Sequence, residues 1–187
     1  MSLIGKRIGD FDAKAYHNGD FVDIKSEDII GKWSVFVFYP ADFTFVCPTE
    51  LGELADLYDE FKKIECEVYS VSTDSHFAHK AWYDTSETIR KIRFPMISDS
   101  AHDISNDFRV FVPGLGIAMR SSFIVNPDGI IVSYEVNDLG IGRNSAELLR
   151  KVHAAQYVEK NKDRVCPASW IPGAETVGLT ADLVGRI

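Results

Sequence analysis

The segment WSVFVFYPADFTFVCPTE, residues 33–50, leads from an apolar run to a thiol. Residues 33–39 are almost wholly apolar and rich in aromatic and β-branched side chains, which is typical of a strand covered on both faces. Pro48 indicates a helix start, because proline is favoured at the first helical position and the residue before it avoids the α conformation. The segment therefore predicts a strand, a loop and a helix, with Cys47 at the start of the helix.

The same two patterns alternate along most of the chain. We expect strands at residues 21–24, 33–39, 66–71, 94–97, 121–125 and 130–136, and helices at residues 48–64, 76–91 and 144–159. The turn sequence Asn-Pro-Asp-Gly at residues 126–129 predicts that the last two strands form an antiparallel hairpin. This order of elements predicts an α/β fold with a mixed central sheet and helices on both faces.

The regular pattern ends near Asn161. Residues 162–187 are rich in proline and glycine, which predicts a C-terminal arm rather than a second folded domain. A chain of 187 residues is long enough for one domain with its own core. We therefore expect a main domain at residues 1–161 and an arm at residues 162–187.

Charge and hydropathy exclude several classes of partner. The net charge of −8 argues against nucleic acid or an anionic membrane, because both require clustered lysine and arginine. No apolar run approaches the ~18 residues of a transmembrane helix. The first residues, MSLIGKRIGDFDAKAY, include acidic side chains and no apolar core, unlike a secretory signal. We expect a cytoplasmic protein.

Three cysteines are too few and too scattered for a disulfide scaffold, and no CxxC or zinc-like spacing occurs. Cys47 lies within about one turn of a predicted helix start, where unpaired N–H groups and the helix dipole stabilise an anion. Thiols in such places ionise readily, and the thiolate is the reactive form. A buried packing cysteine remains the alternative for Cys47. Cys66 opens an apolar strand and has no polar activator, so we interpret it as a packed side chain.

The segments around two of the cysteines resemble those of a known family. FYPADFTFVCPTE contains the pattern Pro-x-x-x-Thr-x-x-Cys as Pro40, Thr44 and Cys47, and RVCPASW surrounds Cys166. Both are similar to the active-site segments of typical two-cysteine peroxiredoxins of the bacterial alkyl hydroperoxide reductase type. The likeness runs from end to end and includes VYSVSTDSHFAHKAW and GIGRNSAELLRKVHAAQYV.

The resemblance implies a thioredoxin-like fold and a thiol-dependent peroxidase that acts on hydrogen peroxide and small organic hydroperoxides. It implies that Cys47 is oxidised to a sulfenic acid and that Cys166 of a partner subunit resolves it as a disulfide. It also implies homodimers that assemble into a decamer, with no cofactor or metal. A flavin-dependent disulfide reductase is the expected electron donor, and thioredoxin is the alternative.

The resemblance also assigns roles to neighbouring residues. Thr44 would hydrogen-bond the attacking thiolate and the peroxide, and Pro40 would shield the sulfur. Arg120 would stabilise the thiolate and the charge that moves to the leaving oxygen. Glu50 and Arg143 would hold this arrangement in place.

Two other functions compete with the peroxidase. A thioredoxin-like dithiol reductase is disfavoured because the chain has no CxxC. A ring with chaperone-like holding activity stays open. The family signature of easy over-oxidation is incomplete here, because residues 113–116 read PGLG rather than GGLG and the arm lacks a Tyr-Phe pair. His76 and His79 lack a third partner for a metal, so surface or capping roles are expected.

The cysteine assignments give a direct test. Cys47→Ser should abolish peroxide consumption in the presence of a thiol reductant. Cys47 is the one cysteine that is predicted to lie at a helix start, and Thr44 is near it in the sequence. Cys66→Ser is the matched control and should keep nearly all activity. Near wild-type turnover by the folded Cys47→Ser protein would end the assignment of Cys47 as the nucleophile.

Overall fold

The computed structural model describes residues 2–185, apart from the side chain of Asp182. The chain divides into two compact units, Met1–Ser145 and Ala146–Ile187. Residues 162–187, the predicted arm, lie within the second unit, and their separate role stays a prediction.

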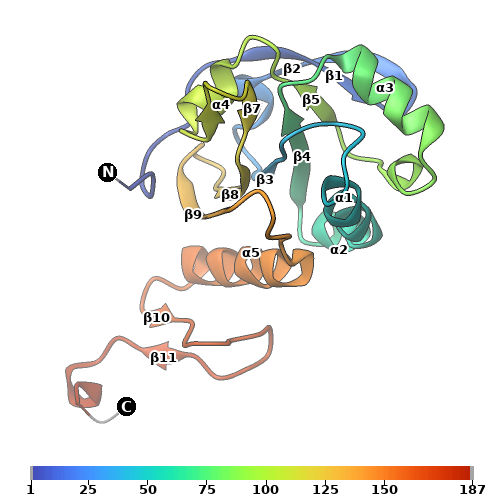
Figure 1. Cartoon of the computed structure of the whole chain (residues 1–187). Coiled ribbons are helices and arrows are strands. Elements are labelled where there is room, and N and C mark those ends of the chain that lie inside the picture. The colour runs from blue at the N-terminus through green and yellow to red at the C-terminus, as the bar shows by residue number, and fades with distance from the viewer. Residues whose placement is uncertain (1, 186–187) are drawn as a thin grey trace. The chain divides into compact units, whose positions relative to one another are not determined.

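The first unit is built around one mixed sheet of seven strands in the order β2-β1-β5-β4-β3-β8-β9 (Figure 1). These strands are β1 (Asp12–His17), β2 (Asp20–Lys25), β3 (Trp33–Phe38), β4 (Cys66–Ser72), β5 (Met96–Ser98), β8 (Arg120–Val125) and β9 (Ile131–Asn137). Neighbours β3, β4 and β5 are parallel, and the remaining pairs are antiparallel. The predicted hairpin is confirmed, since β8 pairs with β9 and Gly129 has the positive φ of 76° that such a turn requires.

The helices of this unit are α1 (Cys47–Asp56), α2 (Tyr58–Lys63), α3 (His76–Thr85) and α4 (Asp103–Asp107), with short 3-10 turns η1 (Ser26–Asp28) and η2 (Ile89–Lys91). The single helix predicted at residues 48–64 was wrong: it divides at Leu57, whose ψ of −1° departs from helical geometry. The apolar spacing continues across this break, so the spacing alone gave no sign of it. The helix predicted at residues 76–91 ends at Thr85, because Ser86 is extended.

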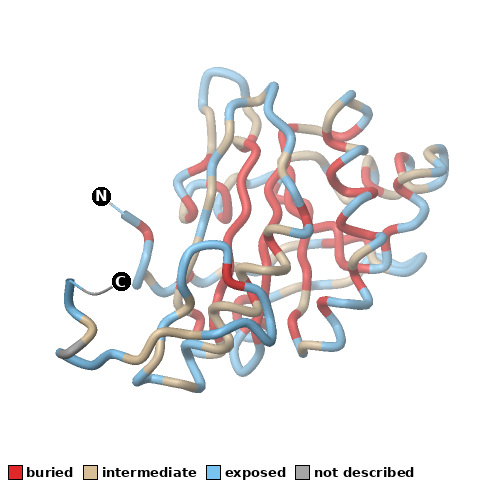
Figure 2. The backbone as a smooth tube through the Cα atoms, turned by 90° about the horizontal axis from the view of Figure 1, so that it is seen from below, coloured by how far each residue is buried: buried red, intermediate tan, exposed pale blue. Residues whose placement is uncertain are grey.

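The core lies on both faces of the sheet. Every residue of β3 and β8 is buried, and the central strands form the longest buried stretches in Figure 2. On one face, aromatic side chains of β3 and β8 pack with α4: Phe36, Phe38, Phe123, Ile104 and Phe108. Helices α1, α2 and α3 contribute nothing to that cluster, and α2 contacts β4 while α3 contacts β1 and β5. The predicted α/β fold with a mixed sheet and helices on both faces is confirmed.

Strand β1 was not predicted. It pairs with β2 across the two-residue turn Asn18-Gly19, in which both residues have positive φ. Its sequence, DAKAYH, is polar and half exposed, so it lacks the continuous apolar run of the central strands. The Asn-Gly dipeptide is the strongest short-range hairpin signal and would have located this strand.

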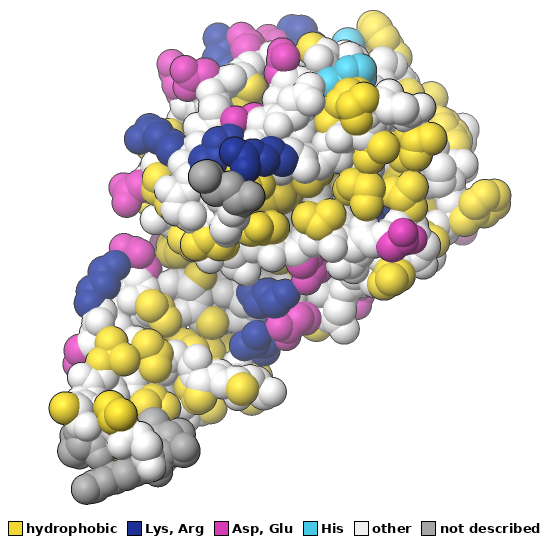
Figure 3. All heavy atoms as spheres, turned by 60° about the vertical axis from the view of Figure 1, so that its left-hand side comes forward, with side chains coloured by type: hydrophobic (Ala, Val, Ile, Leu, Met, Phe, Trp, Pro, Cys, Tyr) yellow, Lys and Arg dark blue, Asp and Glu magenta, His cyan; other side chains and the backbone are white. Residues whose placement is uncertain are grey.

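The second unit contains α5 (Ser145–Lys160), β10 (Arg164–Val165), β11 (Val177–Gly178) and the turn η3 (Ala181–Leu183). Strands β10 and β11 form a short antiparallel pair. Two further short strands of the first unit, β6 (Phe111–Val112) and β7 (Ile117–Ala118), do the same. Hydrophobic and charged side chains share the surface (Figure 3). Within residues 2–185, no helix is long and apolar enough to cross a membrane.

The close approach of α1 to η2 gives a test of this packing. A Cβ at Gly52, in the interior of α1, would lie 2.6 Å from Cγ2 of Thr88. Gly→Ala inside a helix normally stabilises by about 1 kcal/mol. We expect Gly52→Ala to lower the free energy of unfolding instead, by about 1–3 kcal/mol in urea titrations, because the methyl group overpacks this contact.

Thr88→Ser removes the methyl group that a new Cβ would meet. The double variant Gly52→Ala/Thr88→Ser should therefore regain most of the lost stability, and Thr88→Ser alone serves as the control. A Gly52→Ala protein more stable than wild type would contradict the packing.

Candidate active site

Cys47 is the first residue of α1 and is 1% exposed. A loop, residues 39–46, connects it to β3 on the central sheet. No side chain caps the start of α1, and Pro48 occupies its first turn as predicted. The positive end of the helix dipole therefore acts on the sulfur of Cys47, and Glu50, the acidic residue of the first turn, is itself paired with arginine side chains.

Arg120 supplies a second positive group. Its Nη1 donates toward the Cys47 sulfur at 3.6 Å, while Nε and Nη2 donate to the carbonyl of Leu139 at 3.2 and 2.9 Å. The register of the sheet explains this position. Phe38, the last residue of β3, pairs with Ser121 of β8, so Arg120 lies next to the point where the chain leaves β3 for the Cys47 loop.

Glu50 links this arginine to a second one. Its carboxylate is hydrogen-bonded to Nη1 of Arg120 and receives Nε and Nη2 of Arg143 at 2.8 and 2.9 Å, with the Arg143 backbone N–H at 2.8 Å. Arg143 also donates to the carbonyl of Ser121 at 2.6 Å. Burial raises the pKa of the Glu50 carboxyl, but the hydrogen bonds and charge of Arg143, with the charge of Arg120, hold the pKa below its usual range.

The charges of Glu50, Arg120 and Arg143 do not cancel. Two guanidinium groups and one carboxylate, all nearly buried, leave one positive charge beside Cys47. An anion is strongly favoured at such a place, because little water is present to screen the charge. The Cys47 sulfur is the group toward which the Arg120 guanidinium is directed.

Thr44 and Pro40 lie on the same loop. The Thr44 hydroxyl donates to the carbonyl of Ala41 at 2.9 Å, and its predicted bond to the sulfur stays a prediction. Pro40 is buried, two residues after the end of β3. Phe43, with a positive φ of 56°, and Phe45 expose their rings on the same loop.

A buried polar cluster at the base of this loop was missed by the sequence analysis. His79 Nδ1 lies 2.8 Å from the carboxylate of Asp42, which also accepts the hydroxyl of Tyr39 at 2.8 Å. Burial raises the pKa of the Tyr39 phenol well above its ordinary value, so this hydroxyl remains a donor. A surface or capping role for His79 was wrong, because the ring is fully buried. Its partner is 37 positions away, which no local pattern could indicate.

The other two cysteines have different surroundings. Cys66 is buried at the start of β4, and burial raises the pKa of its thiol, with a further contribution from Glu67. Cys166 follows β10 in the second unit and is partly exposed. Burial raises the pKa of its thiol, and the charge of Arg150 acts in the opposite direction. Among the described residues, no group of three His, Cys, Asp or Glu side chains is arranged to hold a metal.

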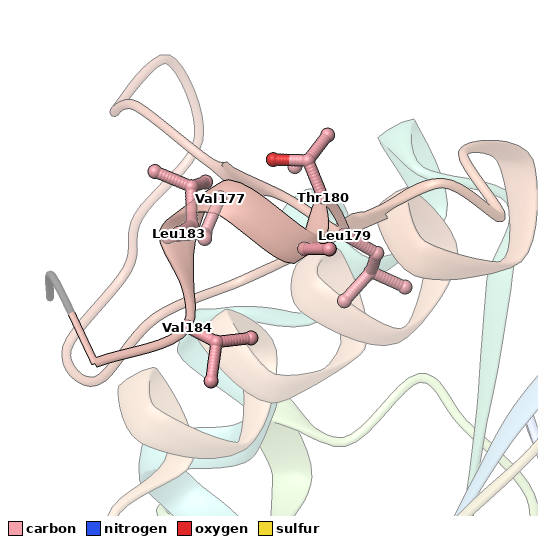
Figure 4. Close-up of a pocket in the computed structure, with 7 residues that line it drawn as sticks. Val177, Leu179, Thr180, Leu183 and Val184 are labelled. Atoms are coloured by element: carbon pink, nitrogen blue, oxygen red, sulfur yellow. The ribbon is translucent and has the colours of Figure 1, made fainter.

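The second unit also contains an apolar hollow of about 390 Å³. Figure 4 shows its lining, which comes from β11, η3 and the residues that follow each of them, and includes Val177, Leu179, Leu183 and Val184. None of the predicted site residues lines it.

The fold and the site together define an α/β protein with a buried cysteine that is polarised by a helix N-terminus and a guanidinium group. Residues 4–134 match the AhpC/TSA family, and the chain belongs to it. It is 54% identical to alkyl hydroperoxide reductase C of Bacillus subtilis and 51% identical to that of Escherichia coli K12, in each case over the full length of both chains.

Comparison with solved structures supports the same family. The crystal structure of Enterococcus faecalis AhpC has a TM-score of 0.87 at 53% identity and covers 89% of this chain and 100% of its own. The reduced 2-Cys peroxiredoxin of Plasmodium vivax has a TM-score of 0.89 at 34% identity, covering 94% and 93%. The predicted membership of this family is confirmed.

The contact between Arg120 and Cys47 predicts the behaviour of an Arg120→Met protein. Peroxide reduction should slow by at least about tenfold, or about 1.4 kcal/mol, because the thiolate loses its nearest cation. The pH profile for alkylation of Cys47 should also move upward. Arg93→Met, which removes an exposed arginine paired with Asp59, is the control and should change neither quantity. An unchanged alkylation profile for Arg120→Met would remove Arg120 from the site.

Proposed function

We propose that this chain is a thiol-dependent peroxidase that reduces hydrogen peroxide and small organic hydroperoxides to water and alcohols. The main support is the sulfur of Cys47, which is buried at a helix start 3.6 Å from the Arg120 guanidinium. Membership of the AhpC/TSA family, and relatives named alkyl hydroperoxide reductase C, agree with this reaction.

In the first step the Cys47 thiolate attacks one oxygen of the peroxide. The S–O bond forms as the O–O bond breaks, sulfur is oxidised to a sulfenic acid, and the other oxygen leaves and takes up a proton as water or an alcohol. Arg120 can follow the negative charge from the sulfur to the leaving oxygen, because its Nη1 is already directed at the sulfur.

Thr44 and Pro40 act on the same step in this proposal. The Thr44 hydroxyl, bonded to Ala41 in the structure, turns to the thiolate and the peroxide when substrate is present. Pro40 keeps the base of the loop dry, since its ring is buried and it has no N–H that requires a partner. Glu50 and Arg143 hold Arg120 in place.

In the second step Cys166 of a partner subunit forms a disulfide with Cys47. Disulfide-bonded cysteines have Cα atoms within about 7 Å, and Cys47 is almost completely buried, so the first turn of α1 must open for the bond to form. Residues 162–187 act as the arm that brings Cys166. Exposed apolar side chains at Ile171, Leu179 and Val184 suit a segment that packs on a second copy of the chain.

The disulfide must then be reopened by an external reductant. We propose a flavin-dependent disulfide reductase in this role, with thioredoxin as the alternative, and a cytoplasmic location in which both occur. The working assembly is a homodimer that forms a decamer.

The trans arrangement predicts a covalent dimer. After one equivalent of peroxide, non-reducing electrophoresis of the wild type should show a dimer that dithiothreitol returns to monomer. Cys166→Ser should give no such dimer, and its Cys47 should accumulate as a sulfenic acid that excess peroxide over-oxidises. Cys66→Ser is the control and should dimerise normally. A peroxide-treated wild type that stays monomeric would exclude the inter-chain bond but not the role of Cys47.

A further inference from the structure

The turn that carries Cys166 is anchored on α5 at both of its ends. At the first end, the Cys166 sulfur lies 3.9 Å from the carbonyl of Ala154. At the second, Trp170 is 5% exposed, its ring centroid lies 5.2 Å from that of Tyr157, and its backbone N–H donates to the carbonyl of Pro167 at 3.2 Å. The resolving cysteine is therefore part of a compact structure within the second unit.

Arg150 of α5 provides the polar part of the second anchor. Its Nη1 donates to the carbonyl of Trp170 at 2.8 Å, while Nε and Nη2 pair with the carboxylate of Glu147 at 2.6 and 2.8 Å. Arg150 and Ala154 are one helical turn apart and so lie on the same face of α5. The guanidinium is thus fixed at one end of the turn, and the sulfur of Cys166 rests at the other.

The charge of Arg150 acts on the Cys166 thiol. Burial raises the pKa of this thiol, and Arg150 is the group that opposes the rise. The pKa of Arg150 is itself raised, first by its hydrogen bond to Glu147 and also by the charge of Cys166. Arg164 lies two residues before Cys166, but its guanidinium is bonded to the hydroxyl and carbonyl of Thr176.

We propose that Arg150 is a positioning residue for the resolving half of the reaction: it fixes the Cys166–Trp170 turn on α5 and supplies the positive charge that favours Cys166 as a thiolate. The inference rests on the proposed function, because it assumes that Cys166 resolves the sulfenic acid of Cys47. It adds Arg150 to Cys166 as a second group that the second unit contributes to the mechanism.

The step that Arg150 assists is a displacement at sulfur. The Cys166 thiolate gives its electron pair to the sulfenic sulfur of Cys47, the S–S bond forms, and the S–O bond breaks. Hydroxide leaves and takes up a proton as water. Cys166 is oxidised to the level of the disulfide as Cys47 is reduced to it, so no other oxidant or reductant enters.

The first test isolates the Cys166 thiol. In the full-length Cys47→Ser/Cys66→Ser protein, iodoacetamide reacts only with Cys166, and its rate is followed across pH. Arg150→Gln should slow this reaction by about tenfold at a pH below the midpoint, because the thiolate fraction falls. Arg150→Lys, which keeps a charge, should stay within about threefold of the parent protein. Lys162→Gln removes an equal charge from an exposed pair with Glu159 and is the control.

The second test follows both half-reactions in the protein with all three cysteines. Arg150→Gln should react with peroxide at the wild-type rate in stopped-flow experiments, yet form the Cys47–Cys166 disulfide about tenfold more slowly. Its Cys47 should therefore be over-oxidised at lower peroxide concentrations. A merely unfolded or weakened protein would instead lose both half-reactions.

The outcomes are separable. If the wild type forms the disulfide and Arg150→Gln forms it equally fast with an unchanged alkylation profile, the role of Arg150 is overturned and the proposed function stands. If Arg150→Gln fails to fold, Arg150→Lys is compared with Lys162→Gln: slower disulfide formation in Arg150→Lys, with alkylation of Cys166 still within about threefold of the parent, supports the anchor on Trp170, and disulfide formation at the Lys162→Gln rate refutes that anchor. A wild type that forms no Cys47–Cys166 disulfide would overturn this inference and the second step of the proposed function, and peroxide reduction by Cys47 would be judged separately.

Discussion

The carboxylate of Glu50 sits between two buried arginines, and the arrangement of the site depends on it. It joins three segments that are distant in the sequence: the first turn of α1, the start of β8 and the segment that contains Arg143. Removal of one partner from such a buried ion pair typically lowers the free energy of unfolding by about 3–5 kcal/mol, because the remaining charge is buried without an opposite charge beside it. The same carboxylate that stabilises the fold keeps Arg120 directed at the sulfur.

This arrangement connects stability to the catalytic cycle. Glu50 lies one helical turn after Cys47, so opening the first turn of α1 disturbs the groups that polarise the thiol. The helix has features that keep this cost moderate: no side chain caps its start, Gly52 lies in its interior, and it ends after ten residues. In the proposed mechanism, this turn is closed around the reduced thiol and opens after oxidation, so that Cys47 meets first a small peroxide and then a second thiol.

Much of the fold could be predicted from the sequence, because the central strands are continuous apolar runs and the turn at residues 126–129 has a strong signal. Strand β1 was not predicted because it lies toward the edge of the sheet and its side chains are half exposed. Cys47 could be located from Pro48 and the helix pattern alone. Glu50, Arg120 and Arg143 could be linked to it only through resemblance, since ion pairs between distant segments leave no periodic trace. The pairing of Asp42 with His79 was invisible for the same reason.

The position of Arg120 at the active site depends on the register between β3 and β8. Phe38 faces Ser121, and side chains alternate between the two faces of a sheet from one residue to the next. A shift of β8 by a single position would therefore turn the Arg120 side chain to the opposite face and replace it with serine or methionine, although every backbone hydrogen bond of the ladder could re-form. The position of the guanidinium group beside the Cys47 sulfur therefore depends on the register of β8, and the packing of Phe123 against Phe38 and Phe108 maintains that register.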